Sequence, residues 1–164
     1  MDKMFKVNFN AKYITKFLNE TSKKLKDLSP LMKIARVFLK NTVDENFETN
    51  GTATGEKWEP WSEKYKKRRA KLNRANGKIL NLDGHLRKSI ISKSGKDFAL
   101  VGTSKEYAAI HNFGGDIKRN NKTIGKMPKR EFMRLNDYKK EELLAELYIK
   151  SEELMLDMRN LKNG

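Results

Sequence analysis

Apolar side chains recur at helical spacing in the first third of the chain. Residues 12–26 carry aromatic and aliphatic side chains on one face with polar residues between them. A second apolar stripe covers residues 31–47 and follows Ser29 and Pro30, a pair typical of a helix start with serine as the N-cap. The pattern therefore predicts two helices, and the short link between them favours an antiparallel pair.

The middle of the chain predicts a short antiparallel hairpin. Ser89–Ser92 and Phe98–Val101 are apolar or β-favouring segments on either side of a turn-forming Ser-Gly-Lys-Asp sequence. Just before them, Asp83 and Gly84 fit either a hairpin turn or a short helix that leads into the strand. We expect the hairpin to form the small antiparallel sheet of the fold.

Three further elements are expected in the second half of the chain. Residues 103–106 resemble a capping box and predict a short helix over 107–113, which a glycine pair then ends. Residues 130–135 favour a last strand. Asn136 can cap a long, acidic, amphipathic helix that continues to about residue 160. Together the elements predict an α+β fold, with two N-terminal helices, a small antiparallel sheet and a long C-terminal helix, as a single domain over residues 1–164.

Two long segments, about 49–78 and 116–128, are polar and glycine-containing, so they are expected to be flexible loops. The first favours a helix around residues 62–72, and the second is either a loop or an exposed hairpin. Both are cationic. Residues 56–78 contain nine basic residues against three acidic ones, and residues 118–134 contain seven against one.

The net charge of +15 over 164 residues has two interpretations. It is either a solvated surface or a surface that meets nucleic acid or an acidic partner. Trp58 and Trp61 beside Pro60 favour local packing, and stacking on single-stranded nucleic acid is the alternative. The absence of cysteine excludes disulfides and thiolate chemistry and is compatible with a cytoplasmic origin. No apolar run reaches the roughly 18–20 residues of a membrane span, and the N-terminus lacks the apolar region of a signal peptide.

Few residues could support catalysis or bind a cofactor. The two histidines, His85 and His111, lie in no metal-binding spacing, and no nucleophile elbow or phosphate-binding glycine motif occurs. We expect His85 to be exposed or half-buried and His111 to be a hydrogen-bonded structural residue. The sequence therefore predicts no enzyme, no metal and no cofactor, and a small hydrolase that uses His111 is the least favoured alternative.

Four motifs occur in a fixed order over roughly residues 30 to 150. They read Gly55-x-x-Trp58; Ile79-Leu80-x-x-Asp83-Gly84-x-Leu86-Arg87-x-Ser89-Ile90; Val101-Gly102-Thr103-x-x-x-Tyr107-Ala108-x-Ile110-His111-x-Phe113-Gly114-Gly115; and Met127-Pro128-x-Arg130-x-Phe132-Met133. The ordered set resembles the phage virion morphogenesis family, the tail-completion or Mu protein-G-like group of tailed phages and prophages. The family usually has Thr/Ser-Gly at residues 83–84 and Ile-Pro-Ala-Arg-Pro-Phe at residues 127–132.

The resemblance implies a non-enzymatic structural protein of the virion, present in the host bacterial cytoplasm during assembly. It would complete the tail or join tail to head, as a homo-oligomeric ring around the DNA channel that contacts other tail or neck proteins. It also implies that Tyr107, Ile110 and Phe113 pack inward. The motif residues expected to have structural roles are Trp58, Gly84, Leu86, Gly102, Tyr107, His111, Phe113, Gly114, Gly115, Pro128, Arg130 and Phe132.

The cationic segments are the expected working surface, because a channel for DNA favours positive charge. The residues that would face DNA or a protein partner are Lys64, Lys66, Lys67, Arg68, Arg69, Lys71, Lys118, Arg119 and Lys122. The runner-up function is a sequence-independent nucleic-acid-binding protein that acts through the same clustered lysines and arginines.

Overall fold

The computed structural model describes residues 12–163, and the N-terminal segment expected not to be a signal peptide lies outside them. The α+β fold is confirmed within this part of the chain. In chain order the elements are α1 (Lys12–Ser22), α2 (Ser29–Thr49), the 3-10 helix η1 (Thr52–Thr54), α3 (Glu63–Lys71), α4 (His85–Lys88), β1 (Ile91–Ser94), β2 (Ala99–Gly102), α5 (Ala108–Phe113), β3 (Gly115–Arg119), β4 (Lys122–Met127) and α6 (Asp137–Asn163).

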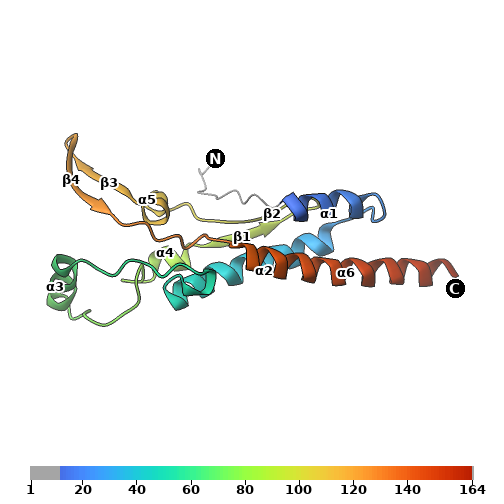
Figure 1. The fold of residues 1–164 in the computed structure, drawn as a ribbon, viewed down its shortest axis with the longest axis horizontal. Coiled ribbons are helices and arrows are strands. Elements are labelled where there is room, and N and C mark those ends of the chain that lie inside the picture. The colour runs from blue at the N-terminus through green and yellow to red at the C-terminus, as the bar shows by residue number, and fades with distance from the viewer. Residues whose placement is uncertain (1–11, 164) are drawn as a thin grey trace.

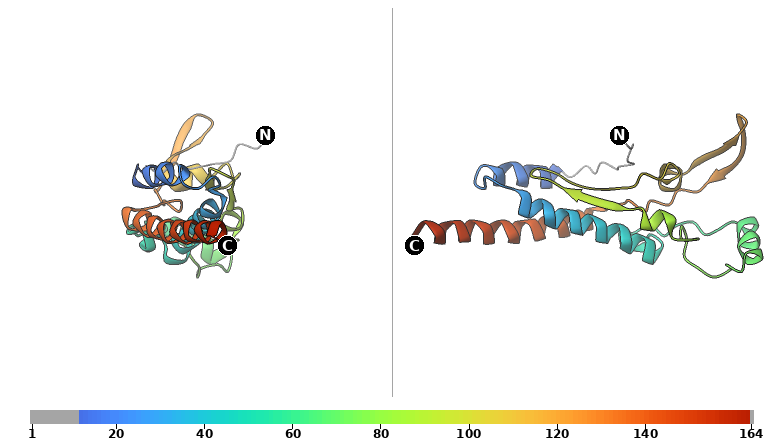
Figure 2. Two further views of the ribbon diagram at one scale, coloured as in Figure 1. Left: turned by 90° about the vertical axis from the view of Figure 1, so that its right-hand side faces the viewer. Right: turned by 180° about the vertical axis from the view of Figure 1, so that it is seen from behind.

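Helix α2 is the centre of the fold. It contacts the β1–β2 hairpin and α6, and α1 turns back at its N-terminal end to pack on α6 (Figures 1 and 2). The prediction that Ser29 is the N-cap of this helix is wrong. The N-cap is Leu28 with Pro30 in the first turn, while the Asp27 carboxylate accepts a hydrogen bond from the Ser29 N–H at 2.9 Å.

Two hydrophobic clusters lie along α2, one at each end. The cluster near α1 contains Leu25, Leu31, Met32, Ala35, Phe38, Leu135, Leu143 and Leu147. The cluster near α5 contains Val43, Phe47, Trp58, Leu86, Ile90, Val101, Ala108, Phe132 and Met133. One amphipathic helix thus contributes buried side chains to both clusters, which is why the apolar stripe of residues 31–47 is so long.

The β1–β2 hairpin forms, but its first strand begins later than expected. Ile91 pairs with Gly102 and Ser94 with Ala99. Ser89 belongs to the end of α4, where its hydroxyl donates to the Leu86 carbonyl at 2.7 Å. Gly84 therefore precedes a short helix, which was the second alternative for the Asp-Gly pair.

Two further expectations about the second half of the chain are wrong. No capping box starts α5, because its N-cap is Tyr107 and no side chain caps it. Residues 130–135 form no strand but a turn at residues 132–133 with irregular backbone on either side. The C-terminal prediction is confirmed, since the Asn136 side chain accepts from the Lys139 N–H at 3.0 Å at the start of α6.

The molecule is elongated, and its two ends differ. At one end, α3 and the β3–β4 hairpin project as two arms from the body (Figure 1). At the other end, the C-terminal part of α6 extends past α1 and α2 (Figures 1 and 2). The β3–β4 hairpin comes from the cationic segment 116–128, so the exposed-hairpin alternative holds there.

Candidate functional site: a cleft between two cationic arms

The base of the arms is held by backbone contacts between α5 and the segment after β4. The Arg130 N–H donates to the carbonyl of His111 at 3.0 Å, and the Met133 N–H donates to the Asn112 side-chain oxygen at 3.0 Å. Asn112 is only 1% exposed. This arrangement explains why residues 130–135 form no strand: side chains and a helix carbonyl, rather than a neighbouring strand, accept their backbone hydrogen bonds.

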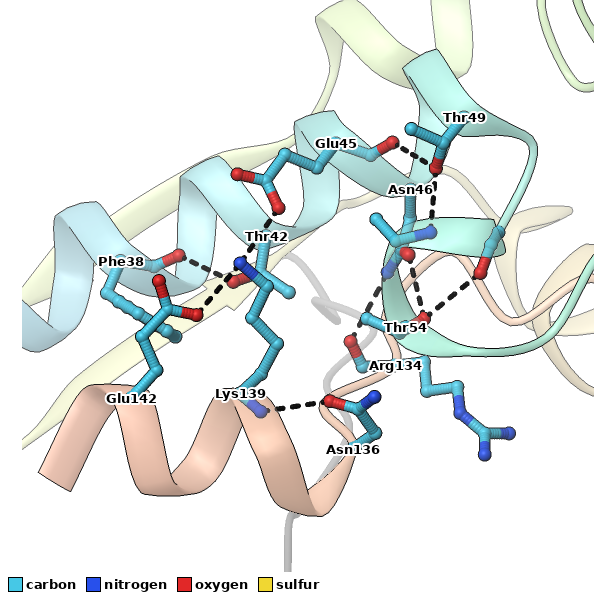
Figure 3. A network of polar contacts seen from close by, with 12 residues as sticks. Phe38, Thr42, Glu45, Asn46, Thr49, Thr54, Arg134, Asn136, Lys139 and Glu142 are labelled. Atoms are coloured by element: carbon cyan, nitrogen blue, oxygen red, sulfur yellow. Dashed lines mark hydrogen bonds and ion pairs between the residues drawn. The ribbon is translucent and has the colours of Figure 1, made fainter.

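A second polar connection centres on Asn46 of α2 (Figure 3). Its amide nitrogen donates to the carbonyls of Phe132 at 3.2 Å and Arg134 at 3.3 Å, and its oxygen accepts from the Thr54 hydroxyl at 2.8 Å. Asn46, Thr54 and Phe132 are buried, and the bond to the Arg134 carbonyl is partly buried. One fully buried side chain thereby joins α2, the η1 turn and the approach to α6.

Sequence reasoning missed Asn46, Thr54 and Asn112. They are polar residues within apolar or loop-like segments, and nothing in their spacing marks them as partners. The only available signal was that a buried helix face containing asparagine must satisfy the amide groups. That signal does not identify which distant backbone group will do so.

Three aromatic rings fill the space beneath this network. Phe47 packs edge-on against Trp58 with ring centroids 5.8 Å apart and is tilted against Phe132 at 5.2 Å. Trp58 is 3% exposed, and its backbone N–H donates to the Asn50 carbonyl at 2.8 Å. The start of the segment 49–78 is therefore packed on the core, and local packing of this tryptophan is confirmed.

Two of the arginines that sequence reasoning assigned to motif or surface positions are buried. The Arg130 guanidinium donates to the carbonyls of Glu59 at 2.9 Å and Pro60 at 3.2 Å. Arg69 lies 4.1 Å over the Trp61 ring and donates to the Arg74 carbonyl at 2.8 Å. Arg69 is 3% exposed, so it holds the α3 arm together and is not part of the cationic surface.

A cleft of about 490 Å³ lies between the two arms. Trp61 and Tyr65 line it on the side of α3, and Ile117 and Met127 line it on the side of the β3–β4 hairpin. His111 lies at its base. Aromatic and aliphatic side chains thus line much of the cleft, beside charged residues of both signs such as Asp83 and Lys126.

The geometry around His111 contradicts the expectation of a hydrogen-bonded histidine. Its Nδ1 atom is buried and has no hydrogen-bond partner among residues 12–163, while the Tyr107 ring packs edge-on at 5.9 Å. Burial, and then the nearby positive charge of Arg130, lower the pKa of His111 from its ordinary value. His111 is thereby kept neutral against the cleft, whereas His85 is exposed, as expected.

The helix that carries His111 packs differently from the expectation. Tyr107 is 43% exposed and Phe113 is 53% exposed, whereas Ala108 and Asn112 are buried. Residues four apart share one face of a helix, so this short helix presents Ala108 and Asn112 to the core. The inward packing of Tyr107 and Phe113 is therefore wrong.

The other motif positions occupy the frame of the site. Leu86, Gly102 and Phe132 are buried, and Gly84 and Gly114 have positive φ, at 73° and 72°. A Cβ on Gly114 would lie 2.9 Å from the Lys129 nitrogen, so this close approach requires glycine. Gly115 begins β3, and Pro128 follows β4 and lines the cleft.

The structure brings the two cationic segments to the same end of the molecule, although some fifty residues separate them in the sequence (Figure 1). The exposed cations are Lys64, Lys66, Lys67, Arg68 and Lys71 on α3, with Lys118, Arg119 and Lys122 on the hairpin. Of the nine basic residues predicted to form a working surface, only Arg69 is buried.

Residues 12–163 contain no cluster of three or more histidine, aspartate or glutamate side chains that could hold a metal ion. In the same part of the chain, no helix combines the length and the apolarity needed to cross a bilayer.

Comparison with known proteins identifies the family. The model of the phage virion morphogenesis family matches residues 9–150. The chain belongs to this family. It is 33% identical over 112 residues to the putative capsid assembly protein G of Escherichia phage Mu. The aligned residues make up 68% of this chain and 71% of the phage protein.

A second relative is similar to a larger part of the chain than the phage Mu protein is. The Mu-like prophage FluMu G protein 2 of Haemophilus influenzae is 30% identical over 138 residues, which is 84% of this chain and 88% of that protein. No solved structure matches the chain. Family membership makes this a phage virion morphogenesis protein, and the resemblance drawn from the four motifs is confirmed.

Proposed function

We propose that this protein is a non-catalytic structural component that completes the tail or joins tail to head, as a homo-oligomeric ring around the DNA channel. The observation that carries the proposal is the polarity of the molecule. Two cationic arms project at one end, and an exposed helix projects at the other (Figure 1). A subunit whose two ends differ and complement each other forms head-to-tail contacts, which close into rings when the rotation permits.

The charge distribution supports a location beside DNA. Helix α3 exposes five cations on one short element, and the hairpin exposes more at the same end. In a ring these arms would lie either toward the lumen, where phosphates pass, or toward an acidic partner protein of the tail or neck. The virion, with the host cytoplasm during assembly, is the location that this role requires.

Deletion of the gene from an inducible prophage that carries it tests the proposal. We expect lysates to contain filled heads and tails that fail to join, or tails with defective ends, when they are viewed by electron microscopy. A plasmid copy of the wild-type gene should restore joined particles. Normal, infectious virions from the deletion strain would overturn the proposal.

Sequence-independent nucleic-acid binding is the second candidate, and the convergence of the two cationic segments favours it. The variant Lys64→Gln/Lys67→Gln/Arg68→Gln changes only exposed residues of α3, unlike any change at the buried Arg69. If binding to phosphates is the main function, the purified protein binds duplex DNA with a steep salt dependence. The slope should then fall by roughly 0.9 for each cation removed from the contact. If heads and tails join normally when the protein carries this variant, the joining does not depend on contact between α3 and DNA.

A further inference from the structure

The β3–β4 hairpin receives little support from its own subunit. Its strands pair with each other from Gly115↔Met127 to Arg119↔Lys122, and the hairpin projects from the body in both views (Figures 1 and 2). An isolated two-stranded hairpin is at best marginally stable in water. A neighbouring surface on which the hairpin rests would remove that weakness.

The outer end of the hairpin offers side chains for such a contact. Arg119 and Lys122 are cross-strand neighbours there, and Ile124 follows on β4 as the residue that the register shift between Ile117 and Lys118 leaves without a cross-strand partner. Ile124 is 61% exposed. This end therefore presents one large apolar side chain near two cations, while Ile117 of the hairpin lines the cleft.

Helix α6 carries a complementary surface on its outward side. Its core face is formed by the buried residues Leu143, Leu147 and Ser151. On the opposite side, Tyr138, Ile149 and Leu156 are 68%, 61% and 56% exposed. Their spacing of eleven and seven residues aligns them along one face of the helix.

Glutamates border this outward stripe on both sides. Helical spacing places Glu141 and Glu152 along one edge and Glu142, Glu146 and Glu153 along the other. Glu142 and Glu153 have lysine partners on the same helix, Lys139 and Lys150, at 3.0 Å and 2.7 Å. The outward side of α6 is thus an apolar stripe with acidic edges, and its charge is opposite to that of the outer end of the hairpin.

We propose that the β3–β4 hairpin of one copy lies on the outward face of α6 of the next copy. Ile124 then packs on the stripe formed by Tyr138, Ile149 and Leu156, and Arg119 and Lys122 meet the bordering glutamates. The inference rests on the proposed ring and defines its subunit contact. The hairpin is short enough to lie within the stripe, because strands of five and six residues span about 17–20 Å, and the 18 helical steps from Tyr138 to Leu156 rise about 27 Å.

The occupant is a second copy rather than the same chain or DNA. The hairpin and the C-terminal part of α6 lie toward opposite ends of one molecule (Figure 1), so they cannot meet within it. DNA would satisfy the cations but would leave Ile124 and the apolar stripe of α6 uncovered. Only a contact between copies covers both apolar surfaces and pairs both sets of charges.

Charge-reversal variants test this contact by mixing. Arg119→Glu/Lys122→Glu alters only the hairpin, and Glu146→Lys/Glu152→Lys alters only α6; all four residues are exposed. We expect each variant to be folded by circular dichroism and to self-associate at least about tenfold more weakly by sedimentation velocity. A mixture of the two should assemble again, because the intact hairpin of one variant meets the intact α6 of the other, and the two reversed surfaces also carry opposite charges.

A matched control reverses two charges elsewhere. Lys64→Glu/Lys67→Glu on α3 makes the same change in net charge, and we expect its assembly to match that of the wild type. Because the chain has no cysteine, Ile124→Cys/Ile149→Cys also provides a pair of unique thiols for a short bismaleimide cross-linker. Its reaction should yield a ladder of covalent multimers.

The outcomes separate this contact from the proposed ring. If the wild type assembles, but both charge-reversal variants assemble equally well or the mixture does not assemble again, the contact is wrong while the ring proposal stands. A wild type that remains monomeric at high concentration and with its virion partners overturns both. Loss of DNA binding in the hairpin variant with unchanged assembly also overturns the contact, since it assigns the hairpin to nucleic acid.

Discussion

The most direct test of the scaffold beneath the arms is Asn46→Ala. The substitution removes three hydrogen bonds, two donated to backbone carbonyls and one accepted from Thr54, from a residue that is fully buried. At about 0.5–1.5 kcal/mol for each net hydrogen bond, the free energy of unfolding should fall by about 1.5–4.5 kcal/mol. For a domain of this size that corresponds to a decrease in Tm of roughly 5–15 °C.

Urea denaturation followed by circular dichroism measures this loss. The matched control is Asn41→Ala, which makes the same chemical change on the same helix at an exposed position. It should alter the free energy of unfolding by no more than about 0.5 kcal/mol. Equal stability of the two variants would refute the view that the Asn46 network joins α2 to the segments on either side of the arms.

Two further predictions concern the base of the cleft. Because the folded protein lowers the pKa of His111 below its ordinary value of 6.5, the unfolded chain binds a proton more readily, and stability should fall as the pH decreases through that range. His111→Gln should therefore lose less stability than the wild type between pH 7 and pH 5 in urea titrations, and His85→Gln, the same change at an exposed position, is the matched control. Gly114→Ala should destabilise the protein by about 1–3 kcal/mol, because φ is +72° and the new Cβ would lie 3.0 Å or less from the backbone of the segment after β4. Gly125→Ala has no such conflict and should change the stability by less than about 1 kcal/mol.

Each of these two predictions has a clear contrary result. Identical pH dependence in His111→Gln and the wild type would show that the folded protein does not disfavour protonation of this ring. A Gly114→Ala protein as stable as Gly125→Ala would show that the turn between α5 and β3 does not need a positive φ.

Sequence patterns predicted the long elements because those elements depend on periodicity. The stripe of residues 31–47 and the acidic C-terminal helix each repeat an apolar spacing over many residues, so local exceptions do not hide them. The basic stretch around residues 62–72 also formed a helix, α3. In each case the element is long or its composition is strongly biased.

The errors occurred where long-range hydrogen bonds replaced local ones. Residues 130–135 have strand-like composition, but their backbone groups bond to Asn46, Asn112 and the His111 carbonyl. The expected inward packing in α5 failed because a helix of six residues has only one narrow buried face, which Ala108 and Asn112 occupy. No local pattern records such partners, because they are contributed by segments far away in the chain.

Three of the residues that carried the family resemblance are part of the frame and not of the proposed working surface. Trp58 and Phe132 pack in the core, and the Arg130 guanidinium donates its hydrogen bonds to the carbonyls of Glu59 and Pro60, just before α3. Their chemistry is directed inward, so none of the three is available as an anchor for a partner. The surfaces proposed for contact between copies are the outer end of the hairpin and the outward stripe of α6, and the cations of α3 are left for DNA or another partner. A substitution at Arg130 should thus affect assembly only through the position of the arm, whereas one at Lys122 or Ile149 acts on the contact itself.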